Sequence, residues 1–104
     1  MAIEYIALIP AYEPDDKLAG VVGDLKEKGF DIVIVDDGSG PDHAELFSRV
    51  SDDATVLTHK TNKGKGAALR TGLEHIYRYR SHAWLNPKLI ICYSKQSYEV
   101  GGSK

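Results

Sequence analysis

The sequence has few of the residues that stabilise small extracellular or metal-binding proteins. Its one cysteine, Cys92, cannot form an internal disulfide, and no paired cysteines or histidines have the spacing of a metal site. The beginning of the chain has no basic flank and no long apolar run, which argues against a signal peptide and a membrane-spanning helix. We therefore expect a protein of the reducing cytoplasm.

An excess of positive charge is also absent. The chain has 13 Lys and Arg against 15 Asp and Glu, a formal net charge of -2, whereas nucleic-acid-binding proteins normally carry clustered positive charge. We therefore expect small ligands and no nucleic acid. The hydrophobic fraction of 42% is ordinary for a soluble globular protein, and 104 residues suffice for one small domain.

Three short apolar runs have the pattern of β-strands. The first two are continuous, which is typical of parallel strands buried on both faces, and the third is shorter. Pro10 ends the first run and Asp36 follows the second. The runs are Tyr5–Ile9, Ile32–Val35 and Thr55–Thr58.

Helical patterns alternate with these runs. The first is expected to begin at Pro14, with Asp15 and Asp16 at the positive end of the helix dipole, and to stop at Gly29. A short helix is expected over about residues 42–50, and a third begins near Gly66. The expected apolar faces are Leu18, Val21, Val22 and Leu25 in the first helix, Leu46, Phe47 and Val50 in the second, and Leu69, Leu73, Ile76 and Tyr77 in the third, where Gly72 permits close packing.

Alternating strands and helices with short connections predict an α/β fold of three layers. A mainly parallel sheet with right-handed crossovers would be covered by helices on both faces. In such sheets, ligands bind at the carboxyl ends of the strands. The segments that follow the three strands are therefore the candidate sites.

The first segment is Pro10-Ala11-Tyr12-Glu13, a stiff turn that presents an aromatic ring and a carboxylate. A flat ring can stack on a base. The same residues are also compatible with an ordinary helix lead-in that Glu13 caps.

The second segment is Asp36-Asp37-Gly38-Ser39. Its carboxylates can accept hydrogen bonds from a base or a ribose, and Gly38 can adopt positive φ and bring the backbone close to a ligand. An everyday turn has the same residues. A receiver-like signalling domain also has acids at a strand end, but it needs a further Asp after a central strand, and His59-Lys60-Thr61 follow the third run.

The third segment, Asn62-Lys63-Gly64-Lys65-Gly66-Ala67, is a basic, glycine-bearing loop that leads into a helix. Backbone N–H groups, the helix dipole and the two lysines suit a diphosphate. The spacing is not that of a P-loop, and the segment around Gly38 and Gly40 lacks the third glycine of a dinucleotide fingerprint. A solvated loop is the alternative.

Taken in this order, the three segments resemble the front of the family-two glycosyltransferases with the GT-A fold, especially those that transfer sugars to polyprenyl phosphates. The resemblance covers roughly residues 3–77. It is carried by the segments Ile9–Glu13, Val33–Ser39 and Asn62–Leu73.

The resemblance implies a nucleotide-sugar donor site. Pro10, Tyr12 and Glu13 would border the nucleoside, Asp36 or Asp37 would hold the base or ribose of a UDP- or GDP-sugar, and Lys63, Gly64 and Lys65 would lie along the base and diphosphate. In the family, a divalent cation, magnesium or manganese, neutralises the departing diphosphate while an acceptor attacks. Full-length relatives can be membrane-peripheral.

The chain departs from this pattern after residue 80. The family's next strand ends in an Asp-x-Asp-type motif, but the candidate strand Leu89–Tyr93 runs into Ser94-Lys95-Gln96, and Glu99 is the only acid after Glu74. Residues 1–74 hold 14 acids and 8 Lys or Arg, a sum of -6, whereas residues 75–104 hold 1 and 5, a sum of +4. We therefore divide the chain into a donor-binding front portion, 1–80, and an atypical basic segment, 81–104, with one extra strand. An altered or shortened chain and a genuine basic tail are both compatible with this change.

Catalysis by this chain alone is not expected, since neither cation ligands nor a general base is visible. His43, His59, His75 and His82 show no ligand or triad spacing and are expected at the surface. Two functions remain open: the donor-binding portion of a glycosyltransferase, or a catalytically inactive nucleotide-binding or interaction module. An exposed sheet edge would allow a homodimer.

Overall fold

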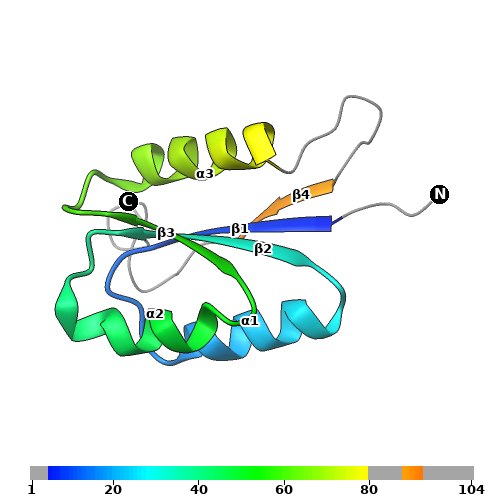
Figure 1. Ribbon diagram of the computed structural model, residues 1–104, viewed down its shortest axis with the longest axis horizontal. Helices are drawn as coiled ribbons and strands as arrows, with labels where there is room; N and C mark the ends of the chain where they lie inside the picture. The colour runs from blue at the N-terminus through cyan, green and yellow to red at the C-terminus, as the bar shows by residue number, and fades with distance from the viewer. Residues whose placement is uncertain (1–4, 80–87, 93–104) are drawn as a thin grey trace, which may run out of the picture.

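Four parallel strands form the centre of the computed structural model, which describes residues 5–79 and 88–92 (Figure 1). The strands are β1 (Tyr5–Ala11), β2 (Asp31–Asp37), β3 (Thr55–His59) and β4 (Lys88–Ile91), in the spatial order β3-β2-β1-β4. All three pairings are parallel. The predicted α/β fold with a parallel sheet is thus confirmed.

The central positions belong to β1 and β2, whose apolar residues are buried on both faces. Residues 6–11 and 32–37 are all buried, whereas β3 is mostly half-buried. This distribution follows from the sequence. An uninterrupted apolar run has apolar side chains on both faces of the strand, and a strand buries all of them only when both faces of the sheet are covered.

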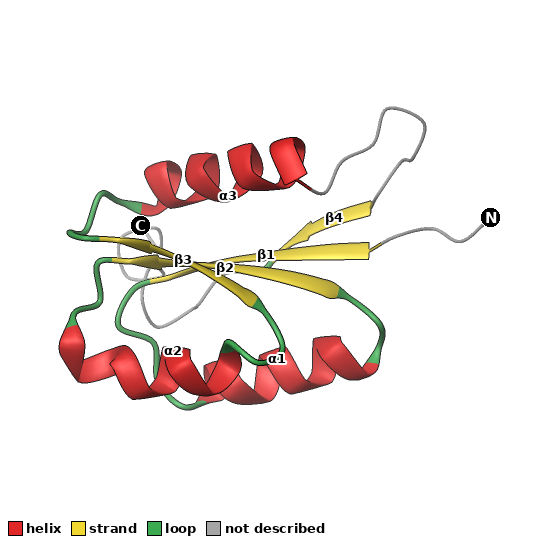
Figure 2. Ribbon diagram, viewed as in Figure 1, coloured by secondary structure: helices red, strands yellow, loops and turns green. Residues whose placement is uncertain are grey.

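Helices cover both faces of the sheet (Figure 2). α1 (Lys17–Glu27) and α2 (Ala44–Val50), the latter preceded by the 3-10 turn η1 (Pro41–His43), lie on one face, and α3 (Lys65–Tyr79) lies on the other. The buried side chains accordingly form two clusters, one between the sheet and α1 and α2, the other between the sheet and α3. The three-layer prediction is confirmed.

The beginning of α1 differs from its prediction. The helix starts at Lys17, so Pro14 precedes the helix, and the Asp15 carboxylate accepts a hydrogen bond from the Lys17 N–H at 3.0 Å. Val21 was expected to be buried but is 41% exposed. The predicted stop is correct: Gly29 has φ 86°, and the Phe30 N–H donates to the Leu25 carbonyl, as in a Schellman motif.

The face that α3 buries also differs in part from its prediction. Ala68, Gly72 and Ile76 are buried, whereas Leu73 is 40% and Tyr77 is 81% exposed. The reason is Gly72, where any Cβ would overlap the side chain of Leu8 in β1, so this face of the helix lies directly on the sheet. The close packing expected at Gly72 is confirmed.

The last described strand, β4, pairs with β1 on one side of the sheet. It begins at Lys88, one residue before the predicted start, and Tyr93 lies outside the described residues. Leu89, Ile90 and Ile91 are 42%, 40% and 37% exposed. Over the described ranges, no helix has the length and apolar character needed to cross a membrane.

Candidate functional site

The three predicted segments meet at the carboxyl edge of the sheet. In the sheet register, Ala11 lies beside Asp36 and Asp37 lies beside His59, so the segments after β1, β2 and β3 leave from the same edge. The Glu13 N–H donates to Ser39 Oγ at 2.8 Å, which ties the first segment to the second. Residues that are 26 positions apart in the chain are thereby brought into one site.

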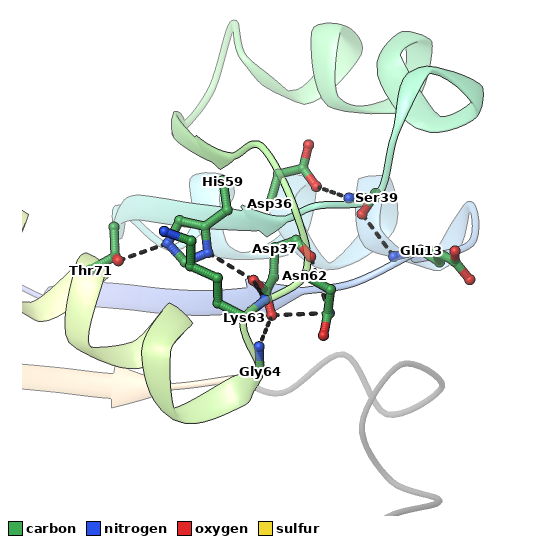
Figure 3. Close-up of polar contacts among 9 residues, drawn as sticks. All are labelled: Glu13, Asp36, Asp37, Ser39, His59, Asn62, Lys63, Gly64 and Thr71. Atoms are coloured by element: carbon green, nitrogen blue, oxygen red, sulfur yellow. Dashed lines mark hydrogen bonds and ion pairs between the residues drawn. The ribbon is translucent and has the colours of Figure 1, made fainter.

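Asp36 and Asp37 point to opposite faces of the sheet, as Figure 3 shows. Successive strand residues alternate between faces: Ile34 packs in the cluster with α1 and α2, and Val35 packs in the cluster with α3. Asp36 continues the first face and Asp37 the second. The two carboxylates therefore have separate environments and do not form a pair facing one ligand.

The Asp36 carboxylate lies at the side of α2 and is nearly buried, at 8% exposure. Its Oδ1 accepts a hydrogen bond from the Ser39 N–H at 3.0 Å, which closes the turn after β2. It also borders an open pocket of about 510 Å³ between α2 and β3. Of the eight predicted site residues, only Asp36 lines this pocket, whose other lining residues are Gly40, Pro41, Ala44, Phe47, Ser48, Ser51, Val56, Thr58, His59 and Lys60.

The Asp37 carboxylate is fully buried and faces the chain's own loop between β3 and α3. The Lys63 and Gly64 N–H groups each donate to it at 2.9 Å, and the Asn62 amide donates at 3.2 Å. His59 Nδ1 lies 2.7 Å from Oδ1. The carboxylate thus acts in this structure as an internal acceptor for the glycine-bearing loop (Figure 3).

His59 lies between Asp37 and α3, and its expected position at the surface is wrong. Its side chain is only 9% exposed, and Nε2 lies 2.8 Å from Thr71 Oγ1. Sequence spacing gave no sign of this arrangement because Asp37 precedes His59 by 22 residues. The available signal was the predicted topology, because Asp37 and His59 follow two parallel strands whose carboxyl ends meet at one edge of the sheet.

Glycines allow the two loops to approach each other closely. Gly38 has φ 77°, and a Cβ there would overlap the backbone of Thr61 and Asn62. Gly64 has φ 98°, a conformation that side chains disfavour. The expectation that Gly38 adopts positive φ is confirmed. Its backbone, however, lies against the backbone of Thr61 and Asn62, at the start of the third segment, whereas a ligand was expected there from the sequence.

The first segment presents its polar groups outward. Pro10 is fully buried at the end of β1, Tyr12 is half-buried, and Glu13 is exposed with φ 50°. The Glu13 carboxylate is the main cause that raises the pKa of Tyr12 above its usual value of 10.0, and partial burial, a hydrogen bond with Glu13 and the charge of Asp37 add to the effect. The phenol is therefore neutral near neutral pH and suited to stacking.

The predicted phosphate-binding segment combines an exposed lysine with the start of a long helix. Lys63 is exposed, and Lys65 is the first residue of α3. The first helical hydrogen bond runs from the Ala68 N–H to the Gly64 carbonyl at 3.0 Å, so the N–H groups of the preceding turn point beyond the helix end. This end of α3 suits an anion, whereas the Lys63 and Gly64 amides already donate to Asp37.

The carboxylates of this site do not fit a divalent cation. Asp37 directs both oxygens to hydrogen-bond donors of the chain itself, and Asp36 points to the other face. Within residues 5–79 and 88–92, no group of three His, Cys, Asp or Glu side chains is placed to hold a metal ion. No chemical step through a metal is therefore derived from these residues.

Comparison with known proteins places the chain in a family. Residues 6–78 match the model of Glycosyl transferase family 2. An uncharacterized protein of Methanocaldococcus jannaschii is 31% identical over 91 residues, covering 86% of this chain and 34% of the relative. A second uncharacterized protein of that organism is 30% identical over 71 residues, covering 64% of this chain and 31% of the relative.

A third relative has a named activity. The UDP-N-acetylglucosamine--dolichyl-phosphate N-acetylglucosaminyltransferase of Methanococcus voltae is 29% identical over 86 residues, covering 67% of this chain and 34% of the relative. The chain thus spans about a third of the length of the curated relatives it matches. No solved structure matches it. The match over most of its length shows that the chain belongs to glycosyl transferase family 2.

Proposed function

We propose that this chain is the donor-binding portion of a glycosyltransferase that uses a nucleotide sugar. The observation that carries the proposal is the meeting of three segments at one sheet edge, with the glycine-bearing loop fastened to β2 through Asp37. This edge combines a ring for stacking, a carboxylate acceptor and an anion-binding helix end, the three kinds of group that a nucleoside diphosphate requires.

The proposed roles follow from exposure and direction. Tyr12 and Glu13 border the nucleoside, and Asp36 accepts hydrogen bonds from the base or ribose. Lys63 and Lys65 lie along the diphosphate at the start of α3. The remaining three residues shape the site from behind, because they belong to its buried or backbone framework: Pro10, Asp37 and Gly64.

The donor is proposed to be a UDP- or GDP-sugar. The name of the Methanococcus voltae relative makes UDP-N-acetylglucosamine the first donor to test, and dolichyl phosphate, a polyprenyl phosphate, the first acceptor for the whole protein. A magnesium or manganese ion is proposed for the intact family member, to neutralise the departing diphosphate. A cytoplasmic location remains a prediction from the sequence.

Calorimetric titration of the purified chain with UDP and GDP, with and without manganese, tests the proposal. We expect one nucleotide to bind, and Asp36→Asn to weaken it about 10- to 100-fold, as for a lost hydrogen bond to a charged group. Asp24→Asn is the matched control, since it removes the same charge from an exposed residue in the carboxyl-terminal half of α1, which does not line the pocket beside Asp36. Absence of binding by either nucleotide would overturn the proposal.

An inactive interaction module is the second candidate, and one observation favours it. The three apolar side chains of β4 are each more than a third exposed on a strand that pairs with β1 alone among the described strands. Edge strands with exposed apolar side chains are sites of strand pairing between chains. We propose a second copy of this chain as the partner at this edge.

A further inference from the structure

We propose that His59 is a positioning residue, which with Asp37 and Thr71 fixes the conformation of the loop Asn62–Gly64 and thereby the affinity for the donor nucleotide. The inference rests on the proposed function, because the loop is assigned to the donor only there. The inference concerns His59, a residue to which the proposed donor site assigns no role. The argument comes from the hydrogen bonds around one buried carboxylate.

The buried carboxylate of Asp37 connects β2 to the loop. It accepts hydrogen bonds from two successive backbone amides, Lys63 and Gly64, and from the side chain of Asn62. Asn62 also donates to the Asp37 carbonyl at 3.2 Å. Since Asp37 is 0% exposed, water competes poorly for these bonds, and the direction of the carboxylate decides where the loop backbone lies.

His59 holds the direction of this carboxylate. Its Nδ1 lies 2.7 Å from Asp37 Oδ1, the oxygen that also accepts from the Lys63 N–H. A carboxylate only accepts hydrogen bonds, so the hydrogen-bond pattern assigns a proton to Nδ1. His59 therefore contacts Asp37 Oδ1, the same oxygen that accepts the hydrogen bond from the Lys63 N–H of the loop.

Thr71 in turn holds the ring of His59. Its hydroxyl lies 2.8 Å from Nε2, and it belongs to the second turn of α3, beyond the loop. His59 is the last residue of β3, and Lys65 is the first of α3. The chain Asp37-His59-Thr71 thus ties together the strand before the loop, the loop itself and the helix after it.

Amide hydrogen exchange tests this role without any ligand. In His59→Ala, we expect exchange at the Lys63 and Gly64 amides to accelerate on the order of tenfold or more, while Leu8 and Ile9 in β1 stay protected. His59→Asn keeps a donor near the Nδ1 position and should restore part of the protection. His75→Ala, which removes a histidine from α3 away from this chain of contacts, should leave both amides unchanged. Unchanged exchange in His59→Ala would overturn the inference.

Nucleotide titration of the same variants tests the link to binding. We expect His59→Ala to weaken the nucleotide about tenfold and His59→Asn to recover part of the loss. Unchanged affinity in a variant with accelerated exchange would overturn the inference but leave the donor site standing. If the unsubstituted chain binds no nucleotide, the proposed function and the link to binding fail together, whereas the exchange result still decides whether His59 holds the loop.

A second variant covers the case in which His59→Ala does not fold. Thr71→Val removes the hydroxyl beside Nε2 with little change of volume, so the core is retained. The expected result is faster exchange at Lys63 and Gly64 with protected β1 amides. Protection of all four amides as in the unsubstituted chain would contradict the proposed chain of contacts.

Discussion

Two neighbouring acids, Asp36 and Asp37, have different structural roles because adjacent strand residues face opposite sides of the sheet. Asp36 closes a turn and borders a pocket, whereas Asp37 receives the loop before α3. The same pair in an exposed turn would have equivalent environments. A substitution at each position is therefore expected to act differently: at Asp36 on ligand contact, and at Asp37 on loop conformation.

Tyr12 provides a prediction of ionisation at the residue scale. The Glu13 carboxylate is the first cause of the raised pKa of Tyr12, so Glu13→Gln should move this pKa back toward 10.0. The sign follows from charge, because a nearby anion disfavours the phenolate. The difference in tyrosinate absorbance between each protein and its Tyr12→Phe version isolates this residue from the other tyrosines.

The consequence for stability lies at high pH. A raised pKa in the folded state means that the neutral phenol contributes stability below the usual pKa of 10.0, and that this contribution is lost as the pH rises through the folded-state value. Glu13→Gln should reduce the loss. An unchanged Tyr12 titration in Glu13→Gln would show that Glu13 is not the cause.

At the scale of elements, the contact between α3 and β1 depends on a glycine, which has no side chain, at position 72. Gly72 lies on Leu8, and even a methyl group there would overlap the leucine, whose side chain is fully buried. The helix can lie this close to the sheet only without a Cβ at this position. The approach also brings Thr71 within reach of His59.

Gly72→Ala is therefore expected to destabilise the fold, by about 1 kcal/mol net. Overpacking costs about 1–3 kcal/mol, and the better helix propensity of alanine offsets about 1 kcal/mol of it. Gly23→Ala in α1 is the matched control: no atom lies within 4 Å of its added Cβ, so propensity alone should stabilise by up to about 1 kcal/mol. Urea unfolding of both variants measures whether each substitution lowers or raises the free energy of unfolding. Stabilisation by both substitutions would contradict the packing argument.

At the scale of the whole molecule, β4 forms an edge of the described part of the sheet and exposes apolar side chains on both faces. Leu89, Ile90 and Ile91 are all exposed by 37% or more along β4, although β4 is paired to β1. The pattern suits a surface that another strand or sheet covers. The proposed second copy is the simplest partner, since it needs no other component.

Self-association through β4 should appear in sedimentation velocity as a concentration-dependent dimer. Ile90→Lys should yield a monomer with an unchanged circular dichroism spectrum, because a charged residue blocks pairing of an edge strand. Leu73→Lys on α3 is the matched control, since both side chains are 40% exposed. A clean monomer of the unsubstituted chain at high concentration would exclude this partner.

The sequence by itself determined the class of fold and the edge that carries the site. Continuous apolar runs, helical patterns and a stop at Gly29 depend on neighbours along the chain, so strand and helix order could be predicted from them. The same locality explains the family resemblance, whose three segments are each continuous in the chain and span the end of a strand or the start of a helix. It also explains the errors at Val21 and Tyr77, where packing rather than local pattern set the buried face.

Only the tertiary structure decided what the polar residues do at that edge. Asp37 meets His59 across 22 residues and Gly64 across 27, and His59 meets Thr71 across 12. No local pattern encodes such contacts, because they arise from the register of β2 with β3 and from how closely Gly72 lets α3 approach the sheet. For this reason, the sequence placed His59 at the surface, and the fold buries it beside the carboxylate that holds the loop.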